Sequence, residues 1–385
     1  MNPTTPARWH SLHVAYYAPD KDALLLDAVR PALAHVADRV SGAHVLRHWR
    51  RGPHLRINVR TEPARWRESV RPDLTATIGA HLRAHPSTTV LDPDEALPRH
   101  RLLALREQEK GPLTPWYPDN SLHEEPYADR RHVMGADAAA DALTAFYDDA
   151  TGPLFAMLEH IRQGRGTRQG LAVTLLLATA HAGAPPLTRS FLSFRSHADG
   201  FLSGCGDPAA VRARFEAAFA RRRGELVELV RAVTGALDDP AAPAPPFVRE
   251  WAALLADHGR RAEPLIARGE LARPDAPRAL PVPELPGVPA GVRVRGLPRD
   301  LAYSDLHRTV FGSEAYQREV FTRPDFLRYR VLLNHTYLHL TRLGLTPVDR
   351  FLTCHLAARA VEETYGVSAV DLMRRAVDRI EARPD

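Results

Sequence analysis

Cysteine is almost absent from this chain of 385 residues, which contains only Cys205 and Cys354. Two cysteines this far apart exclude a disulfide framework and a zinc site made of paired cysteines. The sequence also lacks an apolar run long enough to cross a membrane, and its first residues lack the apolar core of a secretory signal. We therefore expect a cytoplasmic protein without a membrane partner.

Several signatures of ligand binding are missing as well. The sequence has no glycine-rich dinucleotide fingerprint, no P-loop and no H-E-x-x-H box. His335 and His339 are four residues apart, but no carboxylate stands at ligand spacing to support a metal. The net charge of +5 comes from arginines spread along the chain, not from a basic tail with interleaved aromatics. We expect no cofactor, no metal and no nucleic-acid partner.

What the sequence does contain is enough apolar residues, 44%, to bury one large core or two smaller ones. Residues 1–110 predict an α/β sheet subdomain, with strands at 9–17, 43–50 and 54–61 and helices at 20–38 and 62–84. Residues 111–385 predict a mainly helical part, with proline-rich connections at 239–246 and 274–289. The expected fold is α+β, an antiparallel sheet with helices packed on one face, in a single domain 1–385.

The strand expected at residues 54–61 alternates strictly between two kinds of side chain. His54, Arg56, Asn58 and Arg60 share one face, and apolar side chains take the other. Such a basic face is either ordinary solvated surface or a binding surface for an anionic partner. Because Gly52-Pro53 is a turn signal, this strand and the preceding one form a predicted hairpin that brings Arg47 close to the basic face.

Polar side chains are unusually dense between Ser190 and Phe201, a segment that is otherwise apolar. One interpretation is that His197 and Asp199 cap or solvate the start of a helix. The other is that His197 is a general acid or base and that Arg195 binds an anion or a developing oxyanion. Ser196 and Asp199 belong to the same predicted site.

A helix expected at residues 325–343 carries two stripes. Arg330, Asn334, Tyr337 and Thr341 recur at steps of four, three and four and so share one face. The other stripe is mostly apolar and should face the core. Polar stripes are often only solvated surface, but we predict that Asn334 and Tyr337 reach an active site, with Tyr329 as an alternative.

In this order, these segments resemble the C-terminal domain of lantibiotic dehydratases, which also occurs alone in thiopeptide biosynthesis. The resemblance rests on the Trp-led strand at residues 9–17, a helix, an Arg-aromatic strand and the G-P-H-L-R strand that starts at Gly52. It returns in the segments 333–340 and 343–350. A fold of this family and a role in peptide maturation follow from the resemblance.

Two departures separate this chain from the stand-alone elimination enzymes of that family. Those enzymes carry an H-M-x-x-N-R-L-like run where this chain has R-S-H-A-D-G-F, residues 195–201. They also have an R-Y-G-G-like segment where this chain has residues 117–120 and 127–132. Both changes look like the thiopeptide pyridine synthase branch, and they suggest that a glutamylated substrate is no longer handled.

The resemblance implies that the enzyme joins two dehydroalanines of a precursor peptide by a formal aza-[4+2] cycloaddition. Loss of water and of the leader peptide then forms the central pyridine ring and closes the macrocycle, without a cofactor. We predict proton transfer by His197 and Tyr337. The other predicted site residues are Ser196, Asn334 and Tyr329 for catalysis and Arg47, His54, Arg56, Arg195, Asp199 and Arg330 for substrate binding.

The expected partner is a precursor peptide with an acidic or amphipathic leader, and other enzymes of the pathway are possible partners. Two alternatives stay open at this point. A stand-alone elimination enzyme would release glutamate from glutamylated serine or threonine and would use Arg47 and Arg56 as its carboxylate clamp. A non-catalytic subunit would bind the leader and present the peptide to partner enzymes, and it would not need His197 or Tyr337.

Overall fold

The computed structural model describes residues 6–272 and 304–383. Within these residues the chain divides into two compact units, one formed by 6–165 with 342–344 and the other by 166–272, 304–341 and 345–383. The predicted proline-rich connection 274–289 lies outside the described residues. The other connection, 239–246, joins two helices of the second unit without helical structure of its own.

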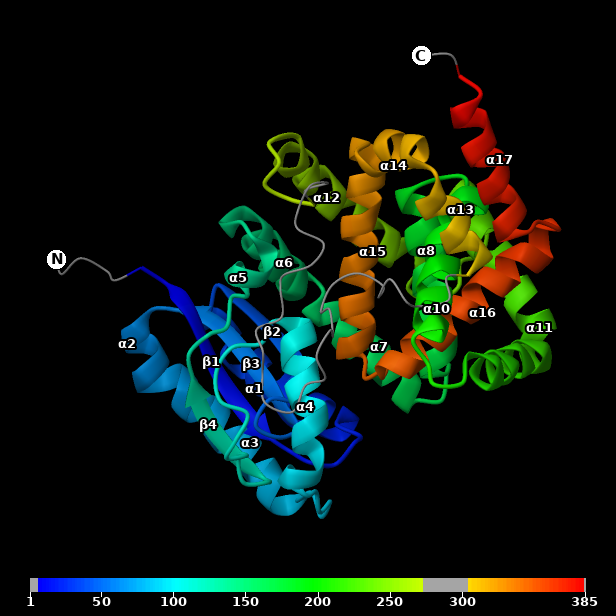
Figure 1. Cartoon of the computed structure of the whole chain (residues 1–385). Coiled ribbons are helices and arrows are strands. Elements are labelled where there is room, and N and C mark those ends of the chain that lie inside the picture. The colour runs from blue at the N-terminus through cyan, green and yellow to red at the C-terminus, as the bar shows by residue number, and fades with distance from the viewer. Residues whose placement is uncertain (1–5, 273–303, 384–385) are drawn as a thin grey trace. The chain divides into compact units, whose positions relative to one another are not determined.

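The first unit contains the predicted antiparallel sheet (Figure 1). Its four strands follow the order β2-β3-β1-β4, and every neighbouring pair is antiparallel. The strands are β1 (Arg8–Ala15), β2 (Gly42–His48), β3 (His54–Thr61) and β4 (Ser121–Glu125). The edge strand β4 comes from beyond the predicted sheet subdomain 1–110, so the sheet draws on more of the chain than the sequence indicates.

One face of the sheet is apolar and packs against helices. Leu12, Leu55 and Ile57 on this face are almost completely buried. The indole of Trp66 stacks on His10 with ring centroids 4.8 Å apart, and Gly79 lies against Leu122. The helical segments that follow β1 and β3 are η1 (Leu24–Val29), α1 (Arg30–His35), η2 (Ala37–Arg39), α2 (Pro63–Arg65), η3 (Trp66–Val70) and α3 (Arg71–Ala84).

The opposite face of the sheet is polar, yet it is also buried. The later part of the first unit covers it: Tyr117 contacts the rings of His13 and His54, and Tyr147 contacts His44. These residues follow or lie on α4 (Pro93–Glu107), α5 (Arg131–Met134), α6 (Asp137–Asp149) and α7 (Thr151–Arg162). The predicted alternation in β3 is therefore correct, but most of its basic face belongs to the interior: His54, Arg56 and Asn58 are buried, and Arg60 near the end of the strand is exposed.

The second unit is entirely helical in its described residues. Its central helix is α8, in which every residue from Leu171 to Ala180 is buried. Helices α11, α12 and α16 pack around it. The helices are α8 (Arg168–Gly183), α9 (Leu187–Ser190), α10 (Leu192–Ser203), α11 (Pro208–Asp238), α12 (Val248–Ala267), α13 (Asp305–Gly312), α14 (Glu314–Phe321), α15 (Pro324–Arg342), α16 (Pro347–Tyr365) and α17 (Ala369–Glu381).

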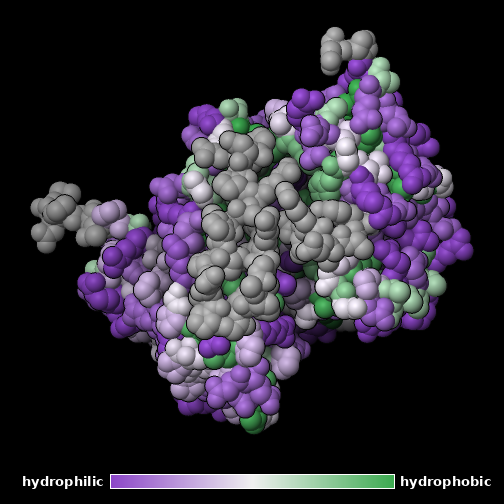
Figure 2. All heavy atoms as spheres, viewed as in Figure 1, coloured by the Kyte–Doolittle hydropathy of each residue, from purple (hydrophilic) through white to green (hydrophobic). Residues whose placement is uncertain are grey.

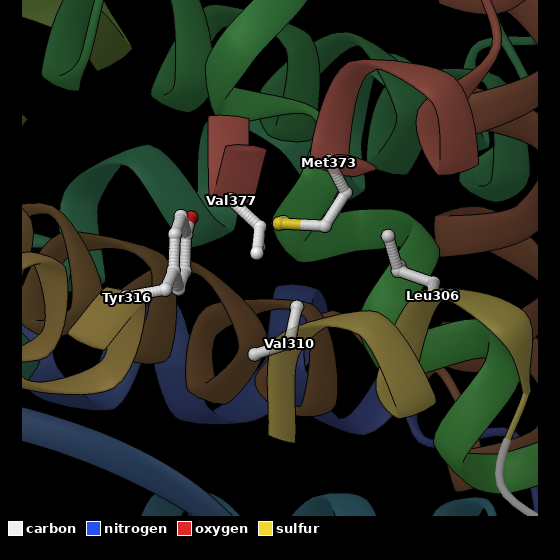
Figure 3. Packing of buried hydrophobic residues seen from close by; sticks show 5 residues of the cluster. All are labelled: Leu306, Val310, Tyr316, Met373 and Val377. Carbon is white, nitrogen blue, oxygen red and sulfur yellow. The ribbon is translucent and has the colours of Figure 1, made fainter. Parts of the chain in front are cut away.

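A small apolar cluster holds α13, α14 and α17 together (Figure 3). Leu306 and Val310 from α13 meet Tyr316 from α14 and Met373 and Val377 from α17. Because α17 is short and strongly amphipathic, burying its apolar face in this cluster is what keeps it on the second unit. The cluster also fixes the position of α13, and His307 on this helix belongs to the site described below.

Gly344 and Pro347 mark the end of α15 and the start of α16. Gly344 has a φ of +95° after the end of α15, a conformation that favours glycine. Pro347 begins α16, and the side chains of Thr346 and Asp349 form a capping box with the first turn. With the sheet and the helical second half in place, the predicted α+β fold is confirmed.

Hydrophilic residues cover most of the visible surface outside the grey atoms, and apolar residues appear there only in scattered patches (Figure 2). Large exposed apolar side chains include Val90 and Val348. In the part of the chain that is described, no helix taken singly has the length and apolarity needed to span a membrane. The stretches Arg168–Gly183 and Leu187–Ser203 pass that test only as a pair, with a bend of 111° between them.

Candidate active site

The polar segment that the sequence singles out forms the helix α10, and His197 lies in its middle rather than at its start. Phe194, Ala198 and Leu202 recur at every fourth position and are buried, so they hold one side of α10 against the core of the second unit. Ser196 and His197 lie beside this apolar stripe and are half-buried. The capping interpretation of His197 is therefore wrong.

His197 contacts Tyr337 directly, as expected if the two residues take part in the same proton transfer. The Nδ1 atom of His197 lies 2.6 Å from the hydroxyl oxygen of Tyr337, and the two rings pack edge to face with centroids 4.9 Å apart. Tyr337 comes from α15 and is 8% exposed. Two residues separated by 140 positions in the sequence thus form one hydrogen-bonded pair.

The direction of this hydrogen bond follows from the neighbours of the tyrosine. Burial raises the pKa of Tyr337 well above its usual value, so the phenol stays protonated. The thiol of Cys354 on α16, 3.5 Å away, donates to the same oxygen, and burial raises the pKa of Cys354 to about 11. Tyr337 therefore donates its proton to Nδ1, and neutral His197 carries its own proton on Nε2.

Positive charge surrounds this neutral pair. Burial, followed by the charges of Arg350, Arg330 and His307, lowers the pKa of His197 to about 4. The guanidinium of Arg350 lies 5.7 Å from the ring centroid of Tyr337 and 5.3 Å from that of Phe351. Among the described residues, no carboxylate forms an ion pair with Arg350. Its charge is thus available to an anionic group near His197.

Arg195 and Asp199 already have partners within the helical unit. The guanidinium of Arg195 lies 3.1 Å from the carboxylate of Asp199 and 3.4 Å from that of Glu362. Asp199 is 1% exposed and also pairs with Arg212 at 3.3 Å. The network ties α10 to α11 and α16. That Arg195 and Asp199 contact substrate stays a prediction, whereas their contacts to other helices are observed.

Ser196 points to a different histidine. Its hydroxyl lies 2.9 Å from Nε2 of His307, which is 3% exposed and lies on α13 between Leu306 and Val310 of the apolar cluster. The other ring nitrogen of His307 lies 3.2 Å from the hydroxyl of Ser304, the residue that caps α13. Neighbouring residues of α10 therefore face separate hydrogen-bonding partners.

The two predicted stripes of α15 separate as expected. Tyr329, Leu333, Thr336 and Leu340 are buried, so the mostly apolar stripe faces the core. On the other stripe, Arg330 and Asn334 are exposed, and Tyr337 is buried against His197. Tyr329 donates a hydrogen bond to the backbone carbonyl of Ser190 at 3.0 Å, which holds α15 to α9.

In the first unit, His54 and Arg56 are part of a buried polar layer. They are 1% and 4% exposed, and Nε of Arg56 donates to Nε2 of His54 at 3.3 Å. Arg56 also pairs with Glu109 at 3.4 Å. Burial lowers the pKa of His54 well below its usual value, so the ring is neutral. Substrate binding by these two residues stays a prediction.

Arg47 does not lie next to Arg56. Its cross-strand partner is Leu55, which places Arg47 on the apolar face of the sheet. There its guanidinium pairs with Asp22 at 3.0 Å and donates to the backbone carbonyl of Arg342 at 2.9 Å. The predicted closeness of Arg47 to the basic face is therefore wrong, because the hairpin register alternates it to the other side.

Sequence reasoning missed three residues of the histidine–tyrosine site: Arg350, Cys354 and His307. A signal was present for the first two, since Arg350 closes the family-like segment 343–350 and Cys354 follows four residues later on the same helical face. His307 had no such signal. Its contact with Ser196 depends on the packing of α13, which only the folded chain reveals.

The comparisons with known proteins agree with this architecture. The model of the lantibiotic biosynthesis dehydratase C-terminal family matches residues 9–361. The chain belongs to this family. A search among curated proteins finds no match.

Two solved structures resemble the chain over nearly its whole length. One is the pyridine synthase TbtD from thiomuracin biosynthesis, with 36% identity, a TM-score of 0.73 and coverage of 94% of this chain and 100% of that one. The other is TsrL, with 23% identity, a TM-score of 0.70 and coverage of 98% and 99%. At its lower identity, TsrL supports the fold alone.

Proposed function

We propose that this chain is an enzyme of thiopeptide maturation that forms a central pyridine ring from two dehydroalanines of a precursor peptide. The observation that carries this conclusion is the 36% identity to a pyridine synthase across 94% of the chain. The reaction is a formal aza-[4+2] cycloaddition. Loss of water and then of the leader peptide as a carboxamide makes the ring aromatic and closes the macrocycle.

The reaction begins with a change of tautomer in the peptide. One dehydroalanine and the amide carbonyl before it must become a 2-azadiene, which requires a proton to move from the amide nitrogen to its oxygen. Neutral His197 suits this step, because its Nε2–H can hydrogen-bond to the amide oxygen while Tyr337 fixes the ring through Nδ1. The amide nitrogen then releases its proton to water and the polarised oxygen gains one from water, so that His197 keeps its own proton. A neutral imidazole held this way polarises a carbonyl without giving up a full positive charge.

Arg350 is our proposed holder of the negative charge that develops on that oxygen. It lies beside the Tyr337 ring, and its lack of an ion-pair partner among the described residues supports the role. A fixed charge in a site partly closed to water stabilises a developing oxyanion more strongly than water does. Exposed Arg330 and Asn334 on the same stripe of α15 are proposed to bind the peptide around the reacting centre.

Most of the acceleration is expected from bringing two remote alkenes together. Holding two reacting groups in line can contribute roughly 7 to 11 kcal/mol, more than any single proton transfer. The partner is a peptide, and we propose that its leader is acidic or amphipathic, since the chain carries a net charge of +5. Binding the leader fixes one end of the substrate and reduces the entropy lost when the alkenes meet.

The test is mass spectrometry of a leader-bearing peptide with two dehydroalanines after incubation with the protein. Ring formation removes one water and releases the leader as a carboxamide, so both masses must appear together. Incubation with a glutamylated peptide provides the contrast, because an elimination enzyme would release free glutamate. Release of glutamate without any pyridine product would refute the proposal.

Two variants distinguish between the two hypotheses that this chain is an enzyme and that it is a subunit that only binds the leader. His197→Ala and Tyr337→Phe should leave peptide affinity unchanged and reduce ring formation. Wild-type product yield from both variants in a reconstituted pathway would show that these side chains do not take part in the reaction.

A further inference from the structure

The buried polar layer of the first unit is organised around one carboxylate, that of Glu109. Its side chain is 6% exposed and lies 2.9 Å from Arg130, 3.4 Å from Arg56, 3.5 Å from His48 and 3.7 Å from Arg50. These partners come from β2, β3 and the loops after β2 and β4. Four basic side chains from distant parts of the sequence thus converge on a single acidic group.

The charges of this cluster do not balance. Burial lowers the pKa of His48 to about 4, so its ring is neutral near pH 7, while three arginines face one carboxylate and leave a surplus of two positive charges. In the described residues, no second carboxylate pairs with Arg50, Arg56 or Arg130. Removing Glu109 would raise the surplus to three charges in a site that is largely closed to water.

The backbone around Glu109 delivers its side chain into the cluster. Gln108 ends α4 in the left-handed conformation, with a φ of 52°. Arg130 donates to the carbonyl of Glu107 at 2.7 Å, and Arg50 donates to that of Lys110 at 2.7 Å. The arginines that face the carboxylate therefore also hold the segment that carries it.

From this arrangement we propose that Arg50, Arg56, Arg130 and His48 form a binding site for a carboxylate, and that the chain fills this site with its own Glu109. The ligand class is a small carboxylate, of which acetate matches the atoms that a change to alanine removes. In the wild-type protein, the side chain excludes external carboxylates and fastens the segment after α4 onto the polar face of the sheet. This inference goes beyond ring formation and does not depend on it.

The experiment compares Glu109→Ala with the wild-type protein in sodium acetate and in sodium chloride of equal ionic strength. Acetate should raise the melting temperature of the variant in a saturable way, by about 2 °C or more at ten times the half-saturating concentration. Wild-type protein and Glu109→Gln, in which the site stays filled, should respond equally to both salts. Neutral acetamide should have no effect on any of them.

Two further variants test whether the rise in melting temperature in acetate comes from the Glu109 site. Glu124→Ala removes another carboxylate of the first unit, one on strand β4 that pairs with Arg71 and is 43% exposed, and this variant should show no preference for acetate. Adding Arg56→Met to Glu109→Ala should abolish the acetate response. Equal melting temperatures of Glu109→Ala in acetate and chloride would overturn the proposal.

If Glu109→Ala does not fold in chloride, the readout becomes the yield of folded protein after dilution from urea. Recovery in acetate but not in chloride or acetamide supports the site. Equal failure in all three solutions rules it out, because a site with three uncompensated arginines must respond to the anion that it is built to hold.

Discussion

At the scale of single residues, the central feature is the order of donors that runs from Cys354 through Tyr337 to His197. Cys354 and Tyr337 keep their protons at neutral pH because burial opposes their ionisation. The thiol donates to the phenol oxygen, and the phenol donates to Nδ1 of His197. These two hydrogen bonds fix the imidazole tautomer in the resting enzyme. The proton on Nε2 of His197 is then ready for the substrate before it binds, so no reorganisation is needed during the reaction.

Tyr337→Phe should slow ring formation with little change in KM. The variant keeps the ring that packs against His197 but removes the hydroxyl that fixes the tautomer, so we expect a fall of roughly a hundredfold in kcat. The rate is measured from the mass of the cyclised product in single-turnover reactions. Tyr365→Phe is the control, since Tyr365 is 42% exposed at the end of α16. A normal kcat for Tyr337→Phe would contradict the proposed role.

Arg350→Met should change the pH dependence of the reaction. Burial lowers the pKa of His197 to about 4, and the positive charge of Arg350 adds to the effect of burial. Removing that charge should raise this pKa, while burial keeps it below its usual value. As the pH falls, His197 therefore becomes protonated at a higher pH in the variant than in the wild-type protein, and the ratio of variant to wild-type kcat should be smaller at pH 5 than at pH 8.

Arg350→Lys is the matched control for charge, because it keeps a cation near Tyr337 but loses the planar guanidinium. Its ratio to wild-type kcat should not vary with pH, even if the absolute rate is lower. An Arg350→Met ratio that is also constant between pH 5 and 8 would mean that Arg350 does not act on His197.

At the scale of elements, α10 is held in place by ion pairs as well as by apolar packing. Asp199→Asn should destabilise the protein by about 3 kcal/mol, because the change removes a buried charge that pairs with both Arg195 and Arg212 and leaves Arg212 without this partner. Urea unfolding measures the loss. Asp305→Asn is the control, since its pair with Arg308 is exposed and such pairs contribute at most about 1 kcal/mol. Equal effects of both variants would argue against an anchoring role.

The sequence predicts elements well where periodicity is local. The alternation in β3 and the stripes of α15 both give correct faces. Strand β4 is missed because S-L-H-E-E has few strand-forming residues. It becomes a strand by pairing with β1 more than a hundred residues earlier, and pairing at that distance leaves no local trace.

The same limit applies to the site. His197 and Tyr337 stand out because polar side chains interrupt apolar patterns, and their hydrogen bond confirms that they lie together. Glu109 does not stand out, since one glutamate after a helix is ordinary. Its role as the partner of four basic side chains arises from the fold of the whole first unit. The periodicity of the sequence therefore cannot predict ion pairs between residues that are far apart in the chain.

At the scale of the whole molecule, buried neutral histidines occur in both units. Burial lowers the pKa of His13 to about 2, of His44 to about 3 and of His335 to about 3. Each of these rings would gain a proton near pH 6.5 in the unfolded chain but not in the folded one. The unfolded state thus binds more protons than the folded state below pH 6.5, and the free energy of unfolding must fall as the pH falls.

The protein should accordingly be markedly less stable at pH 5 than at pH 7. Each such histidine contributes up to about 1.4 kcal/mol per pH unit between 6.5 and its folded-state pKa, so a few of them together reduce stability by several kcal/mol. Urea unfolding at pH 7, 6 and 5 measures the slope. His44→Phe should reduce it, because His44 is completely buried against Trp9 and Tyr147 and a neutral aromatic ring can take its place. A free energy of unfolding that stays constant from pH 7 to 5 would show that these histidines titrate alike in the folded and unfolded chain. Burial would then not keep histidines neutral in this protein, and the proposed tautomer of His197, which depends on such burial, would be wrong as well.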